Sequence, residues 1–390
     1  MKIRRLKLKN WMNYQSMEIP HLHDRMFIIG PNASGKSNLL DALRFLRDIA
    51  LPAGVKPSGG GLQKAVNDRD GLAKLRCLNA KKDTEVLIEV ELEGDDGNNW
   101  LYRLGFKGEG KANNRIVVTQ EYITHNGSVL LNRPDKKDRA DKERLTQSFL
   151  ELTNANAKFR PLSHFFSETT YLHLVPQLLK FSKTIGGSVV ENDPFGQGFL
   201  HRVASTGDKT RDARLRRIQR ALDAVVPQFK DLKFKQDEIT GHPHIEANFT
   251  HWRPTGAWQR ENQFSDGTLR LIGLLWSLMD GNSLLLLEEP ELSLNEEIVR
   301  HLPRVISQIQ KGSKTNRQVI ITTHSEAMLS DRSIGAEEVT RLTPDRNGTS
   351  IKNLNPNEKI MLASGLSVGE VLLRSVKPGN VDQLELSLLN

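Results

Sequence analysis

The sequence has little of what marks exported or membrane proteins. Cys77 is the only cysteine among 390 residues, which excludes an internal disulfide framework and a cysteine-based metal site. No apolar run is long enough to span a bilayer. The N-terminus is basic, but the residues after it alternate like a β-strand instead of forming the apolar core of a signal peptide. These absences predict a cytoplasmic protein without a membrane partner.

The composition is that of a globular protein with an ample core. Hydrophobic residues make up 37% and charged residues 26% of a chain long enough for two or three structural units. The net charge of +8 is compatible with a nucleic acid partner, but many ordinary nucleotide-binding proteins are equally basic. The charge alone therefore decides little. Neither an internal repeat nor a sustained heptad pattern is visible, so we expect no long coiled coil.

One stretch near the N-terminus carries the clearest chemistry. Residues 30–37 fit the phosphate-binding pattern G-x-x-x-x-G-K-S, between an apolar run at 26–29 and a helical stripe beginning at Leu39. Its glycines let the backbone turn sharply, so that N–H groups cradle a phosphate at a helix N-terminus. We expect Lys36 to reach the β- and γ-phosphates and Ser37 to bind Mg²⁺. The predicted ATP-binding residues are Gly30, Pro31, Asn32, Ala33, Ser34, Gly35, Lys36, Ser37 and Asn38.

The distal third supplies acidic partners for such a loop. The apolar residues 283–287 predict a buried strand that ends in Glu288 and Glu289. Adjacent side chains at a strand end point in different directions, so Glu288 is expected to hold Mg²⁺ and Glu289 to activate the attacking water. A second apolar strand, 318–322, leads to His324, which we expect to hydrogen-bond the γ-phosphate. The alternatives are a charged turn after a strand and a histidine with a structural role.

The sequence also predicts the start of a helix before the strand that ends in Glu288 and Glu289. Ser265, Asp266, Gly267 and Thr268 open a helix in which Ser265 is a good N-cap and Gly267 leaves the backbone bare for an anion. Elsewhere, residues 84–131 alternate in polarity and predict an antiparallel meander with turns at 95–98 and 126–127. Residues 133–230 read as mainly helical and polar. Residues 339–354 predict a hairpin, and 367–375 a terminal helix.

Two further groups of residues admit more than one interpretation. The helix predicted over 211–226 carries Arg214 and Arg217 on one flank and Arg216 and Arg220 on another, which could contact a phosphate backbone. A solvated helix face explains this pattern better. Alternate histidines at 242 and 244 could ligate a metal, but no third ligand is well spaced, which favours a surface hairpin.

The set of G-P-N-A-S-G-K-S, S-D-G-T, E-E-P-E and T-T-H-S motifs resembles the ABC-type ATPase heads of the RecF, SMC and Rad50 group. It looks closest to the predicted ATPases of the AAA_21/OLD-like class, over residues 1–50 and 255–330. The resemblance implies an α/β P-loop head with a mixed or parallel core sheet, an antiparallel β subdomain and a helical insertion. We accordingly expect an N-terminal half of the head at 1–132, a mainly helical insertion with a small β segment at 133–250, and a C-terminal half at 251–390.

The resemblance also assigns roles in a dimer. Ser265, Asp266, Gly267 and Thr268 would be the signature motif, which contacts ATP held by a second copy of the chain. The D-loop at the dimer interface would be Leu292, Ser293, Leu294 and Asn295. Many ABC ATPases have Asp where this sequence has Glu288, which leaves the metal distance open. Relatives also carry a glutamine that touches Mg²⁺, for which Gln177 and Gln120 are the candidates.

The implied activity is that of an ATP-hydrolysing switch with ATP and Mg²⁺ as cofactors, assembled as a homodimer or higher homo-oligomer. OLD-like relatives often serve in bacterial defence against phage. The stretch after His324 is short for a Toprim nuclease module, so we expect a separately encoded effector, a nuclease or toxin. The alternative is a RecF/SMC-like DNA-repair or DNA-maintenance ATPase that binds duplex DNA. A transporter ATPase is disfavoured by the long stretch between Lys36 and Ser265.

Overall fold

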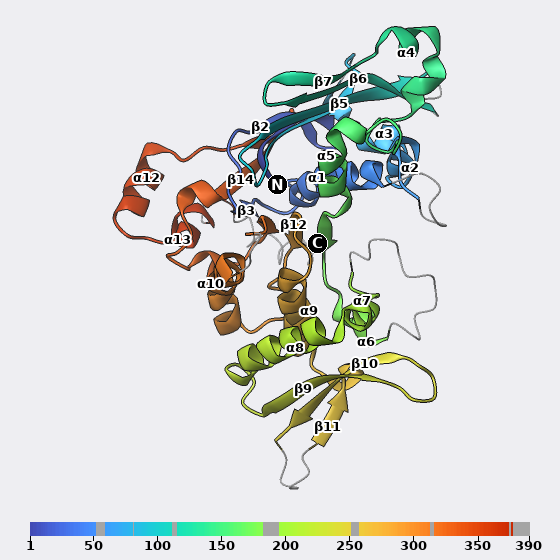
Figure 1. Cartoon of the computed structure of the whole chain (residues 1–390). Helices are drawn as coiled ribbons and strands as arrows, with labels where there is room; N and C mark the ends of the chain where they lie inside the picture. The colour runs from blue at the N-terminus through green and yellow to red at the C-terminus, as the bar shows by residue number, and fades with distance from the viewer. Residues whose placement is uncertain are drawn as a thin grey trace, which may run out of the picture.

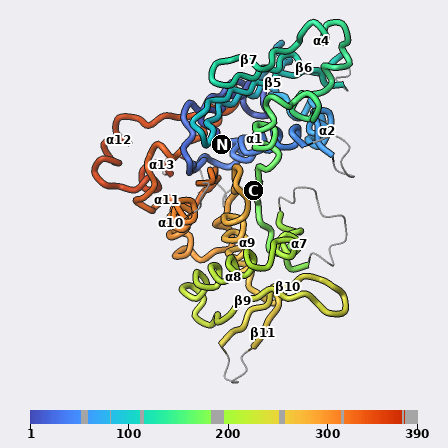
Figure 2. The backbone as a smooth tube through the Cα atoms, in the orientation of Figure 1, coloured from blue at the N-terminus to red at the C-terminus, as the bar shows by residue number. Residues whose placement is uncertain are grey.

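Three β-sheets organise the residues that the computed structural model describes, which are 1–51, 59–80, 82–110, 115–181, 195–250, 257–312, 316–373 and 376. Figure 1 shows an antiparallel sheet at the top, a mixed sheet in the middle and a three-stranded sheet at the bottom. The tube in Figure 2 shows the C-terminal third of the chain returning to lie beside the N-terminal strands. The middle sheet is therefore built from both ends of the sequence.

The mixed sheet has six strands, and five of them run parallel. The strand order is β15 (Gly348–Ile351), β14 (Val339–Asp345), β3 (Arg25–Ile29), β13 (Val319–Thr322), β12 (Leu285–Glu288) and β8 (Thr170–Leu172). Only β15 pairs antiparallel with its neighbour. The three central strands are apolar because helices cover both faces of the sheet, as is typical of parallel sheets.

Alternate residues of the central strands enter two different cores. Met26 and Ile28 pack toward α1 (Lys36–Ala50) and α5 (Arg160–Ser167) on one face. Phe27 and Ile29 pack toward α9 (Asp266–Met279) and α10 (Glu296–Gly312) on the other. This division follows from the period of two in a strand, and it fixes the helices that carry the candidate site.

The antiparallel sheet packs one face against α1. Its strand order is β2 (Tyr14–Ile19), β1 (Lys2–Trp11), β4 (Val86–Glu93), β5 (Asn99–Glu109), β6 (Arg115–His125) and β7 (Ser128–Arg133). Arg133 is fully buried at the end of β7, where it binds Glu121 at 2.8 Å and Asp138 at 2.9 Å. The strands at 86–133 form the meander that the sequence predicts.

The three-stranded sheet consists of β9 (Phe229–Gln236), β10 (Pro243–Phe249) and β11 (Ala257–Arg260). Its apolar face shares a core with α7 (Phe199–Ser205) and α8 (Asp208–Asp223), which in turn pack toward α9. Arg214 of α8 binds Asp280 at 2.8 Å and lies over the ring of Trp276. Arg214 therefore joins α8 to the end of α9, while Arg216, Arg217 and Arg220 remain exposed.

The remaining elements are short. The helices are α2 (Leu62–Asn67), α3 (Leu72–Leu75), α4 (Lys136–Ala140), α6 (Pro176–Lys180), α11 (Glu326–Leu329), α12 (Pro356–Ala363) and α13 (Val368–Leu372). The 3-10 turns are η1 (Leu78–Ala80), η2 (Lys142–Thr146), η3 (Ala157–Phe159), η4 (Glu261–Gln263) and η5 (Ala336–Glu338). None of the helices in these described ranges is long and apolar enough to cross a membrane.

Two features differ from the sequence predictions. Strand β8 comes from the predicted insertion at 133–250, yet it pairs parallel with β12 and so belongs to the mixed sheet. Its three residues are too few for a local pattern, and the pairing is long-range. The predicted hairpin at 242–244 is present, since β9 and β10 pair antiparallel, but it is not wholly at the surface, because His244 is buried with Nδ1 2.8 Å from Oε1 of Glu261. Within the part of the chain described, no group of three metal-ligating side chains is found.

Candidate nucleotide site

The predicted site residues lie at the carboxyl ends of three neighbouring strands. The phosphate-binding loop follows β3, Glu288 ends β12, and His324 comes two residues after β13. Strands β3, β13 and β12 are parallel and adjacent, so their carboxyl ends meet at one edge of the sheet. This edge is the usual place for a ligand in an open α/β sheet.

The phosphate-binding loop is held from behind by the turn between β1 and β2. Gly35 has a φ of +93°, and a Cβ atom there would lie 2.2 Å from the Asn13 side chain. The Asn13 amide donates to the carbonyl of Ser34 at 3.1 Å, and the Tyr14 hydroxyl donates to the carbonyl of Gly35 at 2.7 Å. Sequence reasoning missed these supports, because no local signal connects residues 13 and 14 with the loop.

Lys36 lies folded over its own loop. Its ammonium group donates to the carbonyls of Gly30 at 3.0 Å and Pro31 at 3.1 Å. Burial lowers the pKa of Lys36, while the nearby carboxylates, Glu289 first, act in the opposite direction. The first N–H groups of α1 have no partner within the helix and face the loop. An anion with several oxygens, such as a phosphate chain, fits this combination of a buried cation and free N–H groups.

Ser37 and Glu288 meet where a divalent cation would lie. The Ser37 hydroxyl donates to Oε1 of Glu288, and the Tyr171 hydroxyl of β8 donates to Oε2 of the same carboxylate. His173 places Nδ1 3.3 Å from the carbonyl of Glu288. Mg²⁺ is typically bound by one or two carboxylates together with substrate phosphates, so Ser37 and Glu288 fit that ion.

Tyr171 and His173 were missed from the sequence. They are two residues apart, as expected for side chains on one face of an extended segment, but the strand itself was not predicted. Burial and the charge of Glu288 both raise the pKa of Tyr171, so its hydroxyl stays protonated and donates. Tyr171 thereby orients the carboxylate that Ser37 also contacts.

Unlike Glu288, Glu289 has His324 as its side-chain partner. Its backbone has a φ of +43°, and its N–H donates to the carbonyl of Thr322 at 3.1 Å. Its Oε1 atom lies 3.1 Å from Nε2 of His324. Burial, together with the charge of Lys36, lowers the pKa of His324 below its usual 6.5, so the ring is neutral at pH 7. A carboxylate beside a neutral imidazole can hold a water molecule and accept a proton from it.

Glu291 links the end of β12 to the residues after β13, and Arg270 links it to the helix of the predicted signature motif. Its Oε1 atom accepts from the Thr323 hydroxyl at 2.5 Å and from the N–H of His324 at 3.2 Å. Burial raises the pKa of this carboxyl group. Arg270 of α9, 5% exposed, reaches the carbonyl of Glu289 at 3.4 Å. The end of β12 is thus tied to both β13 and α9.

The predicted signature motif and D-loop lie against each other. Ser265 caps α9 by accepting from the N–H of Thr268 at 3.1 Å. A Cβ atom at Gly267 would lie 2.7 Å from the carbonyl oxygen of Ser293, so only glycine fits this approach. In the D-loop, Leu292 is 40% exposed, Leu294 is half-buried, and Asn295 accepts from the N–H of Glu297. An exposed leucine beside a helix N-terminus offers an apolar contact for another surface.

The two glutamine candidates lie apart from the Ser37–Glu288 contact. Gln177 of α6 donates to Oδ2 of Asp266 at 2.7 Å, and Gln120 of β6 donates to Glu85 at 2.9 Å. The structure therefore brings Ser37 and Glu288 together as predicted, but it joins Gln177 to the signature motif. His173, and neither glutamine, contacts Glu288, through the backbone carbonyl of that residue.

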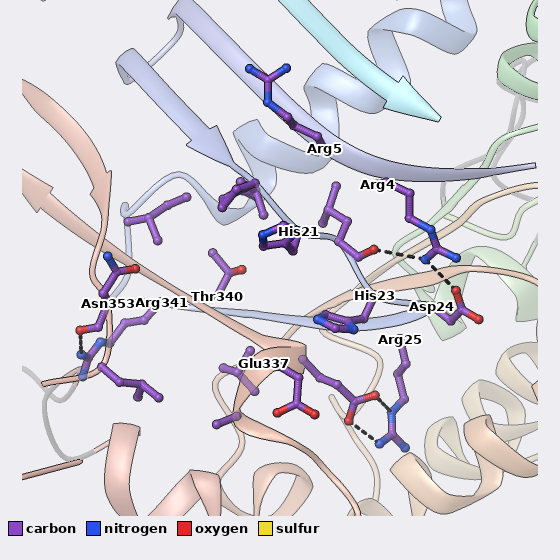
Figure 3. Close-up of a pocket in the computed structure, with 18 of the residues that line it drawn as sticks. Arg4, Arg5, His21, His23, Asp24, Arg25, Glu337, Thr340, Arg341 and Asn353 are labelled. Atoms are coloured by element: carbon purple, nitrogen blue, oxygen red, sulfur yellow. Dashed lines mark hydrogen bonds and ion pairs between the residues drawn. The ribbon is translucent and has the colours of Figure 1, made fainter. Parts of the chain in front are cut away.

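A cavity of about 1570 Å³ lies outside this site (Figure 3). It is lined by the loop between β2 and β3, the start of β14 and the end of α10. Its walls carry paired charges, including Arg25 with Glu338 at 2.7 Å and Arg4 with Asp24 at 2.9 Å. Among the described residues that line it there is no predicted site residue, so it is separate from the phosphate-binding loop.

Comparison with known proteins agrees with these motifs. The sequence matches the family described as "AAA domain, putative AbiEii toxin, Type IV TA system" over residues 25–330. It also matches the "P-loop containing region of AAA domain" over residues 3–46. The matched range spans the phosphate-binding loop, the acidic strand and His324.

Curated relatives and solved structures extend the comparison. The chain is similar to "DNA replication and repair protein RecF" of two Leptospira biflexa strains, 22% identical over 163 residues, which are 39% of each protein. The match therefore spans well under half the length of these relatives.

An SMC head bound to the C-winged helix domain of ScpA superposes with a TM-score of 0.54 at 15% identity, covering 92% of this chain and all of that chain. A Pyrococcus furiosus Smc head bound to the C-terminal domain of ScpA gives 0.52 at 13% identity, covering 93% and 98%. These likenesses confirm the predicted fold class.

Proposed function

The chain belongs to the family described as "AAA domain, putative AbiEii toxin, Type IV TA system", and from this premise we propose that it is a switch that binds and hydrolyses ATP with Mg²⁺. It is an ABC-type ATPase head of the SMC/RecF-like fold. The observation that carries the proposal is the contact of Ser37 with Glu288, beside the pair of Glu289 and His324. These groups come from three separate stretches of sequence and meet at one sheet edge.

Each group has a distinct task in this proposal. The loop N–H groups and Lys36 bind the phosphates of ATP, and Ser37 and Glu288 hold Mg²⁺, which neutralises charge on the β- and γ-phosphates. Glu289 orients a water molecule for attack on the γ-phosphate and accepts its proton. His324, neutral and 3.1 Å from Glu289, carries one N–H, which would hold the Glu289 side chain before ATP binds and hydrogen-bond the γ-phosphate once ATP is bound.

We further propose that two copies of the chain complete each site. The signature residues Ser265, Asp266, Gly267 and Thr268 would contact the ATP held by the partner, and the D-loop residues Leu292, Ser293, Leu294 and Asn295 would line the interface. The exposed side chain of Leu292 supports this arrangement. So does the direct packing of Gly267 on the D-loop, which makes the two motifs one surface. ATP binding would close the dimer and hydrolysis would open it.

The proposed biological role is that of the ATPase subunit of a bacterial anti-phage system with a separately encoded effector, a nuclease or toxin. The family description, which names a putative toxin of a toxin–antitoxin system, is compatible with a defence role. The second candidate is an ATPase of DNA repair or maintenance that binds duplex DNA, favoured by the similarity to RecF. The exposed arginines Arg216, Arg217 and Arg220 of α8 are its best contact surface.

Two carboxylate variants test the chemistry. Glu289→Gln should bind ATP with wild-type affinity but hydrolyse it at least about a hundredfold more slowly, because the water loses its base. Glu288→Gln should weaken Mg²⁺-dependent ATP binding itself. Glu296→Gln, which changes an exposed carboxylate on α10, is the matched control. Hydrolysis by Glu289→Gln at the wild-type rate would refute the proposed role of this residue.

The role is tested by adding DNA. If the second candidate is right, duplex DNA should stimulate hydrolysis, and the effect should fall steeply with salt and with replacement of Arg216, Arg217 and Arg220 by Gln. Arg214 is left unchanged because its replacement would disturb the packing of α8 on α9. Absence of stimulation at low salt, together with co-purification of a nuclease or toxin, would favour the defence role.

A further inference from the structure

Two residues of helix α6 bind Asp266, the one acidic residue of the predicted signature motif. The Lys180 ammonium lies 2.5 Å from Oδ1 of Asp266, and the Gln177 amide donates to Oδ2 at 2.7 Å. The Lys180 side chain is 14% exposed, and that of Asp266 is 37% exposed. Both carboxylate oxygens are thus engaged from the same side, by residues that lie almost a hundred positions away in the sequence.

The charge of Asp266 poses a problem for the site proposed above. Asp266 is the first residue of α9, and its carboxylate lies at the helix N-terminus that would receive the γ-phosphate of the partner's ATP. The positive end of the helix favours an anion there, but a carboxylate and a phosphate repel each other. An unrestrained aspartate in the first turn can also accept from N–H groups of its own helix and so compete with the phosphate.

We propose that Lys180 and Gln177 are positioning residues of the two-chain ATP site. They turn the Asp266 carboxylate toward α6 and cancel its charge, so that it does not compete with the γ-phosphate bound by a second copy for the start of α9, where the Ser265 hydroxyl oxygen accepts from the N–H of Thr268. This inference rests on the proposed function and adds two residues from α6 to it.

A purely structural role makes a different prediction. If the contacts only brace α6 against α9, their loss should lower stability and leave the ATP-dependent contact between chains unchanged. If the contacts instead neutralise the charge of Asp266, removing Lys180 should weaken ATP-dependent dimerisation, and removing the charge of Asp266 as well should reverse that effect. The chain that carries Lys180 keeps its own phosphate-binding loop, so ATP binding to the separate chain should not change.

The test measures ATP-dependent dimerisation by analytical ultracentrifugation in the hydrolysis-deficient Glu289→Gln background. Adding Lys180→Met should weaken dimerisation by about tenfold or more, because it leaves a carboxylate facing a phosphate. Adding Asp266→Asn to that variant should restore dimerisation, and Lys180→Arg should keep it. The matched control is Lys158→Met, which removes an exposed lysine of η3.

The outcomes separate this inference from the function on which it rests. Equal dimerisation with and without Lys180→Met would overturn the inference, as would a failure of Asp266→Asn to restore it. Thermal unfolding of each variant shows whether a loss of dimerisation comes from misfolding. If Lys180→Met is misfolded, Asp266→Asn alone tests the inference, since that variant should dimerise at least as well as the parent. If Glu289→Gln itself stays monomeric with ATP, the two-chain site is refuted and the inference with it.

Discussion

The hydroxyl group of Tyr171 is expected to set the affinity of the site for Mg²⁺. Tyr171→Phe removes the donor to Oε2 of Glu288 and keeps the ring, which is 9% exposed and lies below the Arg44 guanidinium. A hydrogen bond to a charged group contributes about 1.5–3 kcal/mol. Because Glu288 is partly exposed and water can partly replace the lost donor, the lower end applies, about 1.5 kcal/mol or roughly tenfold.

The assay is ATP hydrolysis at fixed ATP and varied free Mg²⁺. The variant should need about tenfold more Mg²⁺ for half-maximal rate, in line with the effect of losing an outer partner of a metal ligand. Tyr122→Phe is the matched control, since its ring packs under Arg103 and its hydroxyl has no bond to the described residues. If Tyr171→Phe requires the same Mg²⁺ concentration as the wild type, the reasoning about Glu288 is wrong.

Three other changes test the site and the fold. Arg133→Met removes the arginine that pairs with the fully buried Glu121 and leaves the buried Asp138 with Arg144 alone, and it should lower the free energy of unfolding by about 3–5 kcal/mol in denaturant titrations, whereas Arg139→Met, on the surface, should change it little. Protonation of His324 pairs its ring with Glu289 and weakens the base, so the hydrolysis rate should fall as pH drops through a value below 6.5, and His324→Gln should abolish this limb of the pH profile. Gly267→Ala places a Cβ 2.7 Å from a carbonyl oxygen of the D-loop and should slow hydrolysis about tenfold with ATP binding unchanged; a wild-type rate would show that this approach is not needed.

The sequence carries the family and the fold class because their signals are local. The phosphate-binding loop needs its glycines and Lys36 at fixed offsets, and the buried strands before Glu288 and His324 are apolar throughout. Those features depend on a few neighbouring residues, so they can be recognised without knowing the tertiary structure. The comparisons confirm both the family and the ABC-type fold class.

The supports of the site depend on long-range pairing and could not be predicted in this way. Tyr171 and His173 reach Glu288 only because β8 joins the edge of the sheet, and three residues give too little pattern to predict a strand. Asn13 supports the phosphate-binding loop from the turn between β1 and β2, and the sequence of that turn has no signal that connects it with the loop. His244 is buried beside Glu261, which lies after β11 and 17 residues further along the chain. In each case the sequence singles out one residue of the contact, and only the tertiary structure identifies the other.

The central claim is that each ATP site is shared by two chains, and mixing two inactive variants tests it most directly. Lys36→Ala should lose ATP binding, and Ser265→Arg should bind ATP but lose hydrolysis. A mixed dimer of the two contains one site in which both halves are intact. The account predicts that an equimolar mixture regains ATPase activity that neither variant has alone, roughly a quarter of the wild-type rate where the chains pair at random and the two sites act independently. A mixture as inactive as its components, or full activity of Ser265→Arg alone, would contradict it.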